Sequence, residues 1–234
     1  MTKGTPLGPL DGIPYSIKDL EPTAGIRTTY GSKFFEQNVP AEDGAVAARL
    51  RASGGVLLGK TNTPHFGYKD MCDNLLGPPC RNPWNLARTS GASSGGAGSA
   101  VAAGLGPLAH GSDGSGSIRI PSALCGIFGM KPSLGRVPYW PSQDLWNARS
   151  HNGPMTRTVR DGALLLQVMA GPDPRDPLSI DTPPAGSPTS AATSRRPRST
   201  GATPTSSTRS STGPTSGPGT TSGRWPGRTG SSRR

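Results

Sequence analysis

The sequence predicts an α/β protein, with a mixed β-sheet core flanked by helices and a disordered C-terminal tail. In the first 180 residues, short apolar runs alternate with helix-like segments between Gly- and Pro-rich turns. Residues 181–234 contain no Leu, Ile, Val, Phe or Met, so they cannot bury enough apolar surface to offset the entropy of folding. We therefore expect a folded domain over residues 1–175 and a disordered tail, rich in Ser, Thr, Pro, Gly and Arg, over residues 176–234.

The charge of the chain says little about the folded part. The 234 residues carry a net charge of +11, but most of it lies in residues 181–234, which hold eight arginines and one acidic residue. The core therefore has an ordinary charge, and we expect it to bind no nucleic acid. The tail has a single aromatic residue, Trp225, which argues against specific nucleic-acid recognition there. A shifted reading frame in GC-rich DNA would also produce such a tail.

The distribution of apolar residues and cysteines bears on location and cofactors. No run of about 18 apolar residues exists, and the N-terminus lacks the apolar region of a signal peptide. We thus expect no membrane segment and a cytoplasmic protein with reduced thiols. The cysteines and histidines show no metal-ligand spacing, so we expect no metal and no cofactor; they are Cys72, Cys80, Cys125, His65, His110 and His151.

The first strand is expected over residues 13–19. Ile13, Tyr15 and Ile17 alternate there with polar residues and Pro14, which belongs at a strand start or on an edge strand. Lys18 then ends the strand on the face opposite Ile17. By spacing alone, such a lysine is more often a solvated charge than a catalytic group. Residues 21–40 are expected to be a loop with short irregular structure.

A helix capped by Asp43 and ended by Gly54-Gly55 is expected next, followed by a short buried strand over residues 56–59. Residues 54–61 also match the phosphate-loop pattern G-x-x-x-x-G-K-[ST]. However, the variable positions of the match are the apolar strand itself. Pro64 follows where a phosphate loop would open a helix, so we reject nucleotide binding.

The remaining elements follow from local patterns. Residues 65–89 have little periodicity and predict a long ordered loop, and helices are expected over 94–104 and from about 118. Short strands are expected at 106–110 and 128–132. Thr158 and Asp161 resemble a capping box, which opens a final helix that Gly171-Pro172 ends.

The chemistry is expected in residues 90–121, where two Ser- and Gly-rich clusters are separated by one apolar crossover. A serine hydroxyl can attack a carbonyl if a base takes its proton. Gly-rich turns can aim successive N–H groups at one point, as an oxyanion hole requires. A flexible linker would have the same composition, but it would not carry the apolar residues between and directly after the clusters.

These motifs resemble the amidase signature family, general amidase branch, over about residues 7–171. The motifs that carry the resemblance stand in the family's order: Gly12-Ile-Pro-Tyr-Ser-Ile-Lys18-Asp19, Leu58-Gly-Lys-Thr-Asn-Thr-Pro, Arg81-Asn-Pro-Trp, Gly91-Ala-Ser93-Ser94-Gly-Gly and Gly111-Ser-Asp113-Gly-Ser-Gly116-Ser117-Ile-Arg-Ile-Pro121. The resemblance implies an amidase, a hydrolase of carboxamides. It also implies family segments before the lysine strand and after the last helix, so residues 1–175 are expected to be a partial amidase domain, truncated at both ends.

The resemblance also implies roles for individual residues. Ser117 would be the nucleophile, Lys18 the general base, and Ser93, on a cis peptide bond, the proton bridge between them. A neutral lysine can serve as the base only if burial lowers its pKa toward neutrality. The remaining implied residues are the oxyanion-hole N–H groups of Gly114, Ser115, Gly116 and Ser117, and the supporting side chains of Ser94, Asp113 and Arg119.

Two positions depart from the family pattern, namely Ala92 and Ser115, where glycine is usual. The expected partner is a small-molecule amide, and the sequence does not give the oligomeric state. Two alternatives stay open: the glutaminase component of a tRNA-dependent amidotransferase, and an inactive fragment or interaction protein. The amidotransferase branch usually has glutamine where this chain has Ile120, which favours a general amidase.

Overall fold

The computed structural model describes residues 4–142 and 150–182. Its main sheet has five strands in the order β2-β1-β5-β7-β6. β1 (Pro14–Lys18) lies between β2 (Val56–Thr61) and β5 (Leu108–Asp113) and runs parallel to both. β7 (His151–Thr156) runs antiparallel to β5 and to β6 (Phe128–Gly129). The sheet is therefore mixed, as predicted, and the N-terminal strand has a partner on each side.

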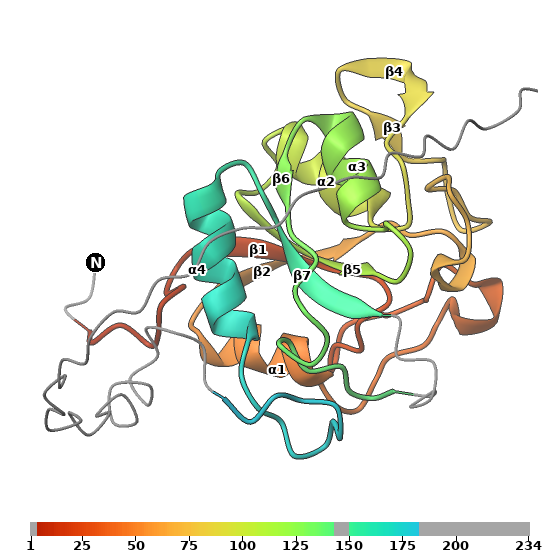
Figure 1. Ribbon diagram of the computed structural model, residues 1–234. Coiled ribbons are helices and arrows are strands. Elements are labelled where there is room, and N and C mark those ends of the chain that lie inside the picture. The colour runs from red at the N-terminus through yellow and green to blue at the C-terminus, as the bar shows by residue number, and fades with distance from the viewer. Residues whose placement is uncertain (1–3, 143–149, 183–234) are drawn as a thin grey trace, which may run out of the picture. The chain divides into compact units, whose positions relative to one another are not determined.

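Helices cover both faces of the sheet (Figure 1). α1 (Ala45–Ala52) and α4 (Val159–Met169) pack on one face, around Tyr15, Ile17 and Leu108. α2 (Gly95–Ala102) and α3 (Arg119–Cys125) lie on the other, over a smaller apolar cluster that includes Ala109 and Met155. Successive strand residues point to opposite faces, which is why Leu108 and Ala109 belong to different clusters.

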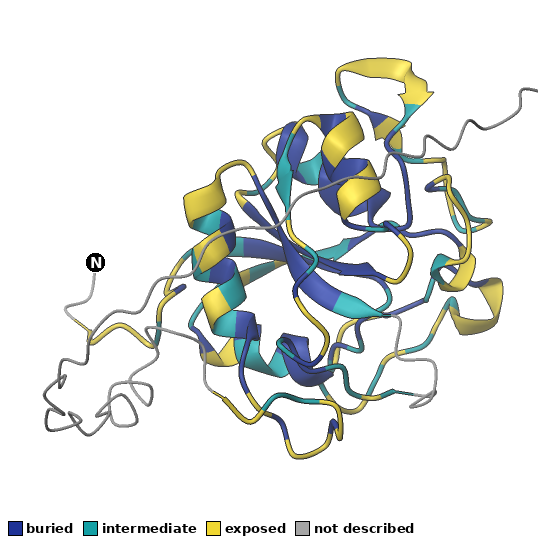
Figure 2. Cartoon of the chain, viewed as in Figure 1, coloured by how far each residue is buried: buried dark blue, intermediate teal, exposed yellow. Residues whose placement is uncertain are grey.

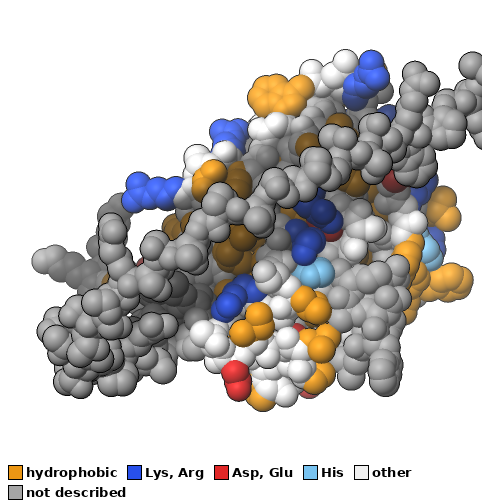
Figure 3. Space-filling view, in the orientation of Figure 1, with side chains coloured by type: hydrophobic (Ala, Val, Ile, Leu, Met, Phe, Trp, Pro, Cys, Tyr) orange, Lys and Arg blue, Asp and Glu red, His pale blue; other side chains and the backbone are white. Residues whose placement is uncertain are grey.

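The central strands are buried, whereas a separate hairpin is exposed (Figure 2). That hairpin consists of β3 (Arg81–Asn82) and β4 (Asn85–Thr89), within the stretch expected to be a long loop. Short 3₁₀ turns at Lys33–Phe35 and His65–Gly67 complete the elements of the described residues. On the face in Figure 3, Lys and Arg side chains of the described residues lie among hydrophobic and uncharged ones, without forming one continuous basic surface.

Two expectations for residues 43–59 are wrong in detail. Asp43 does not cap α1; Gly44 is the N-cap, and Asp43 instead pairs with Arg51 at 2.8 Å. The N–H groups of the first helical turn donate to the buried carboxylate of Glu21, far away in the sequence. β2 is not a buried strand but an edge strand that extends to Thr61, and Val56 is half exposed. An apolar run alone does not tell an edge strand from a central one.

The later elements match the predictions more closely. α2 and α3 begin where expected, and Thr158 caps α4 by accepting the Asp161 N–H at 3.1 Å. The strand expected at residues 106–110 is found as β5 and runs on through Asp113, so that the second serine cluster begins inside the sheet.

The boundary of the expected tail is also different. Residues 176–182, expected to be disordered, contact the core. Ile180 N–H donates to the carbonyl of Gly135, and the Asp176 carboxylate accepts the Tyr139 N–H at 2.9 Å. Residues 183–234, which make up the rest of the expected tail, lie outside the described residues.

Candidate active site

Lys18 lies at the C-terminal end of β1 and is completely buried. Its Nζ donates to Ser93 Oγ at 2.7 Å, to Ser112 Oγ at 3.1 Å and to the Ser112 carbonyl at 3.3 Å. Burial lowers the pKa of Lys18 from 10.5 to about 7, although Cys72 and Asp113 act in the opposite direction. A large fraction of the amine is therefore neutral near pH 7.

The contacts of Lys18 have a consequence for its neutral form. An ammonium has three N–H donors, and the three acceptor atoms around Nζ match that number. A neutral amine has two N–H donors and one lone pair. If the two N–H groups stay on the oxygens of Ser112, the lone pair points along the 2.7 Å line to Ser93 Oγ, ready to accept that hydroxyl's proton.

Ser93 lies in the tight loop that precedes α2. The Ala92–Ser93 peptide bond is cis, as the resemblance implied, and the Ser93 side chain is buried. The first turn of α2, directly after this loop, needs small residues because other backbone lies against it. A Cβ at Gly96 would stand 2.3 Å from the backbone nitrogen of Asn62, closer than any real Cβ contact. Gly96 therefore lets the start of α2 pack directly against Asn62, the residue after β2.

Ser94 connects the two serine loops. Its Oγ donates to the Ser112 carbonyl at 3.1 Å and accepts the Ser112 N–H at 3.2 Å. Its backbone N–H donates to the carbonyl of Ser117 at 3.1 Å. Ser94 therefore fixes the loop that carries Ser117 relative to the one that carries Ser93.

Ser117 follows β5 in a loop that Asp113 organises. The fully buried carboxylate of Asp113 accepts the N–H groups of Gly116 at 2.6 Å and Ile118 at 3.1 Å, and pairs with Arg119 at 2.9 Å. Burial alone would raise the pKa of Asp113, but these hydrogen bonds hold it well below its usual range. Asp113 is therefore ionised at neutral pH and orders the loop.

The two serines are brought to the same cavity but are not directly bonded. Ser93 and Ser117 both line it, yet no hydrogen bond joins Ser93 Oγ to Ser117 Oγ among the described residues. The expected relay is therefore continuous in this structure from Lys18 to Ser93 and open from Ser93 to Ser117. Hydrogen bonds in catalytic sites without substrate are often looser than in the reacting complex.

The four expected oxyanion donors are not equivalent. The N–H of Gly116 is already taken by Asp113, whereas Gly114, Ser115 and Ser117 line the cavity. A donor can stabilise an oxyanion only if it is free to point at the developing charge. The structure thus leaves the N–H groups of Gly114, Ser115 and Ser117 as candidates and gives Gly116 a part in shaping the loop.

The cavity beside the serines measures about 930 Å³ and has an aromatic wall. The rings of Tyr30 and Phe66 stack with centroids 6.3 Å apart, and Phe35 meets each of them edge-on. Tyr30 and Phe66 are also the two described residues other than glycine with positive φ, at 54° and 47°. Such backbone is costly for aromatic residues, so the surrounding structure must hold it.

Sequence reasoning missed Ser112 and the aromatic wall. Ser112 stands in the same motif as Asp113 and Ser117, and nothing in that motif distinguishes it. Only the parallel pairing of β1 with β5, in which Ile17 lies opposite His110, brings Ser112 to Lys18. The aromatic residues come from a stretch interpreted as loop, where no periodicity separates cavity-lining rings from surface ones.

The described residues contain no group of three or more His, Cys, Asp or Glu side chains placed to hold a metal ion. None of their helices combines the length and the apolar character needed to cross a membrane.

Comparison with known proteins gives a consistent set of relatives. A protein-family model described as Amidase matches residues 1–207. An acylamidase from Rhodococcus erythropolis is 53% identical over 178 residues, which cover 76% of this chain and 37% of the relative. A glutamyl-tRNA(Gln) amidotransferase subunit from Roseiflexus sp. (strain RS-1) is 49% identical over 175 residues, covering 75% of this chain and 36% of that protein.

Solved structures are similar to this chain as well. The crystal structure of a bacterial aryl acylamidase of the amidase signature family is similar with a TM-score of 0.73 and 39% identity, covering 77% of this chain and 38% of that one. The chain thus spans little more than a third of the length of the relatives that it matches.

Proposed function

The chain belongs to the amidase family, and we propose that it hydrolyses carboxamides with Ser117 as nucleophile, Ser93 as proton bridge and Lys18 as general base. The observation that carries the proposal is the buried Lys18 amine, with a pKa near 7, held 2.7 Å from Ser93 Oγ. A base needs reach and a pKa near the working pH, and Lys18 has both.

The proposed reaction begins when Ser117 Oγ attacks the carbonyl carbon of the amide. The Ser117 proton moves to Ser93 Oγ while the Ser93 proton moves to Lys18 Nζ. The C–N bond then breaks, and the proton on Lys18 returns through Ser93 to the leaving nitrogen. This leaves an acyl ester on Ser117 and releases ammonia or an amine. Water attacks the ester by the same proton path, releases the carboxylate and restores the three residues.

Substitution of each residue tests the proposal. Ser117→Ala is expected to abolish turnover and labelling by a fluorophosphonate probe, because no other hydroxyl is proposed to attack. Lys18→Ala should be nearly as severe, whereas Ser93→Ala should keep partial activity because a water molecule can replace the hydroxyl. The losses should not add, since the residues act as one relay. Wild-type turnover in both Ser117→Ala and Lys18→Ala would reject the assignment.

A second candidate is the glutaminase role in a tRNA-dependent amidotransferase, which the 49% identity to a glutamyl-tRNA(Gln) amidotransferase component favours. Ile120, at the position where that branch usually has glutamine, argues for the general amidase. Measuring ammonia release from glutamine, with and without an ATP-dependent partner, separates the two functions. Ser117-dependent hydrolysis of simple amides without glutaminase activity would support the general amidase.

A further inference from the structure

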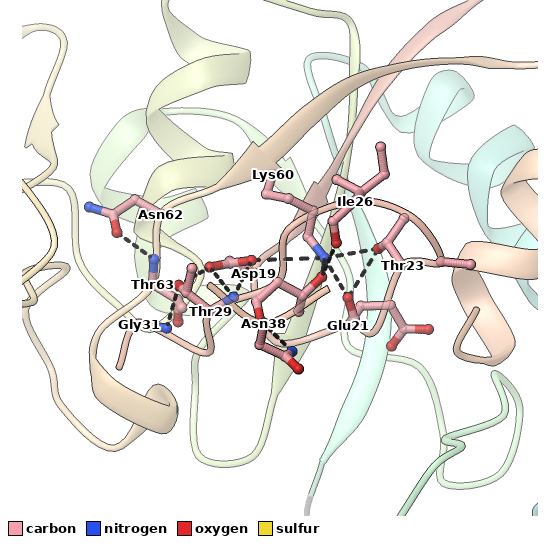
Figure 4. A network of polar contacts seen from close by, with 12 residues as sticks. Asp19, Glu21, Thr23, Ile26, Thr29, Gly31, Asn38, Lys60, Asn62 and Thr63 are labelled. Atoms are coloured by element: carbon pink, nitrogen blue, oxygen red, sulfur yellow. Dashed lines mark hydrogen bonds and ion pairs between the residues drawn. The ribbon is translucent and has the colours of Figure 1, made fainter. Parts of the chain in front are cut away.

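Lys60 is the lysine of the phosphate-loop pattern in residues 54–61. In the structure its side chain lies instead in a network of polar contacts (Figure 4). Its side chain, only 10% exposed, leaves β2 and reaches the loop that follows β1. Nζ donates to Thr23 Oγ1 at 2.8 Å, to Thr28 Oγ1 at 2.9 Å and to the carbonyl of Glu21, and lies 3.9 Å from Asp19 Oδ1. One ammonium thus binds several points of one loop.

The loop held in this way, residues 19–30, forms one wall of the cavity; we call it the wall loop. Leu20, Pro22 and Tyr30 from it line the cavity. Its other end is fixed by Asp19, whose carboxylate accepts both the N–H and the hydroxyl of Thr29. The wall loop is therefore held by the largely buried ammonium of Lys60 and by the carboxylate of Asp19, which lie next to each other.

This network leads directly to the aromatic wall. The Tyr30 N–H donates to the carbonyl of Asp19 at 3.0 Å, and the Tyr30 carbonyl accepts the Phe66 N–H at 2.8 Å. Both residues have positive φ, so these hydrogen bonds help to hold them in a costly conformation. The residue after Phe66, Gly67, lies against Ser93, because a Cβ at Gly67 would stand 3.2 Å from Ser93 Oγ.

We propose that Lys60 is a positioning residue that sets Tyr30 in the cavity wall and so determines which amides bind productively. This inference rests on the proposed amidase function. Tyr30, Phe35 and Phe66 all line the cavity, and aromatic side chains pair favourably with a further ring, so this wall favours substrates that carry an aromatic ring. In the proposed mechanism Ser93 returns the proton to the leaving nitrogen. The wall beside Ser93 therefore faces the amine side of the substrate. In an anilide, this is the side that carries the aromatic ring.

Kinetics separate this role from a purely structural one. Lys60→Met removes the charge and keeps the length of the side chain. We expect it to lower kcat/KM for an anilide such as 4-nitroacetanilide about tenfold, mainly through KM, and to leave propionamide within about twofold. Tyr30→Ala should likewise lower kcat/KM for the anilide, because it removes a ring from the cavity wall. Lys33→Met removes an exposed lysine, 53% accessible, and is the matched control. Equal losses for the anilide and for propionamide would overturn the proposal. A selective loss for benzamide, whose ring lies on the acyl side of the amide, would overturn it as well.

Hydrogen exchange tests the inference without relying on catalysis. In Lys60→Met, the amides of Tyr30 and Phe66 should exchange at least about tenfold faster, while those of β5 stay unchanged. Unchanged protection at Tyr30 would reject the positioning role, even if Ser117-dependent turnover proves the amidase function. Conversely, faster exchange in a chain that hydrolyses no amide would reject the amidase function alone. If Lys60→Met does not fold, Thr28→Val, which removes one acceptor of Lys60, is subject to the same expectations.

Discussion

From the burial of Lys18 we predict how the free energy of unfolding depends on pH, and this prediction does not depend on catalysis. The pKa of Lys18 falls from 10.5 to about 7 on folding, because burial disfavours the charged form. Between these pH values the unfolded chain holds a proton that the folded chain has released, so the free energy of unfolding rises with pH. The slope for one such group is about 1.4 kcal/mol per pH unit, and the whole displacement is worth about 5 kcal/mol.

Replacing Lys18 by methionine removes this slope. The folded state of the wild type bears the full cost of the buried ammonium below about pH 7, and this cost is relieved as the pH approaches 10.5. The advantage in stability of Lys18→Met over wild type should therefore shrink by about 3 kcal/mol between pH 7.5 and 9.5. Other titrating groups are shared by both proteins and cancel in the difference.

Urea denaturation followed by circular dichroism at pH 7.5, 8.5 and 9.5 measures the effect. Lys33→Met serves as the control for loss of a lysine, because that side chain is about half exposed and lies outside the cavity. Parallel pH curves for wild type and Lys18→Met would refute the reasoning. They would mean that Lys18 keeps its proton in the folded state up to pH 9.5, and a lysine of that kind could not serve as a base near pH 7.

Three further predictions concern the rate and the loops. The kcat/KM of the wild type should rise about tenfold from pH 6 to pH 8, through the pKa of Lys18 near 7, and a profile flat over this range would contradict a neutral-lysine base. Gly96→Ala should lower the free energy of unfolding by about 1–3 kcal/mol or more, because its methyl would meet the backbone of Asn62, whereas Gly77→Ala meets nothing within 4 Å and should cost far less in the same urea titration. Asp113→Asn should lower the free energy of unfolding by about 1–3 kcal/mol and slow fluorophosphonate labelling, because one amide oxygen cannot replace a carboxylate that holds three loop N–H groups and a guanidinium. Unchanged labelling would show that the loop does not need this carboxylate.

Local patterns in the sequence predicted the elements whose ends are set by residues close to them in the sequence. The capping of α4 by Thr158 depends on residues three apart, and the start of α2 depends on a cluster of small residues beside an apolar run. β7 was not predicted, because its sequence His-Asn-Gly-Pro-Met-Thr contains Gly and Pro and shows no alternation. It becomes a strand because β5 and β6 pair with it on its two sides, and this pairing is a tertiary effect.

In the candidate site, too, sequence motifs predicted some features, while others depend on tertiary packing. The family resemblance implied that Lys18, Ser93 and Ser117 act as one relay. In the structure Lys18 Nζ donates to Ser93 Oγ, and Ser93 and Ser117 line the same cavity. The contacts of Lys60 could not be predicted, because they depend on how β2 packs against a loop almost 40 residues earlier. The same motif match that suggested a phosphate loop gave no sign of the polar network that the lysine enters.

The position of β1 has a consequence for how the chain acquires its base. β1 pairs with β5, which begins about 90 residues later, so a long loop must close before the lysine strand is enclosed on both sides. At a synthesis rate of about 5–20 residues per second, Lys18 leaves the ribosome about 5 to 20 seconds before β5. Until then its amine is in water and is charged. The chemical character of Lys18 is thus conferred late, by a strand that has not yet been made when the lysine itself emerges.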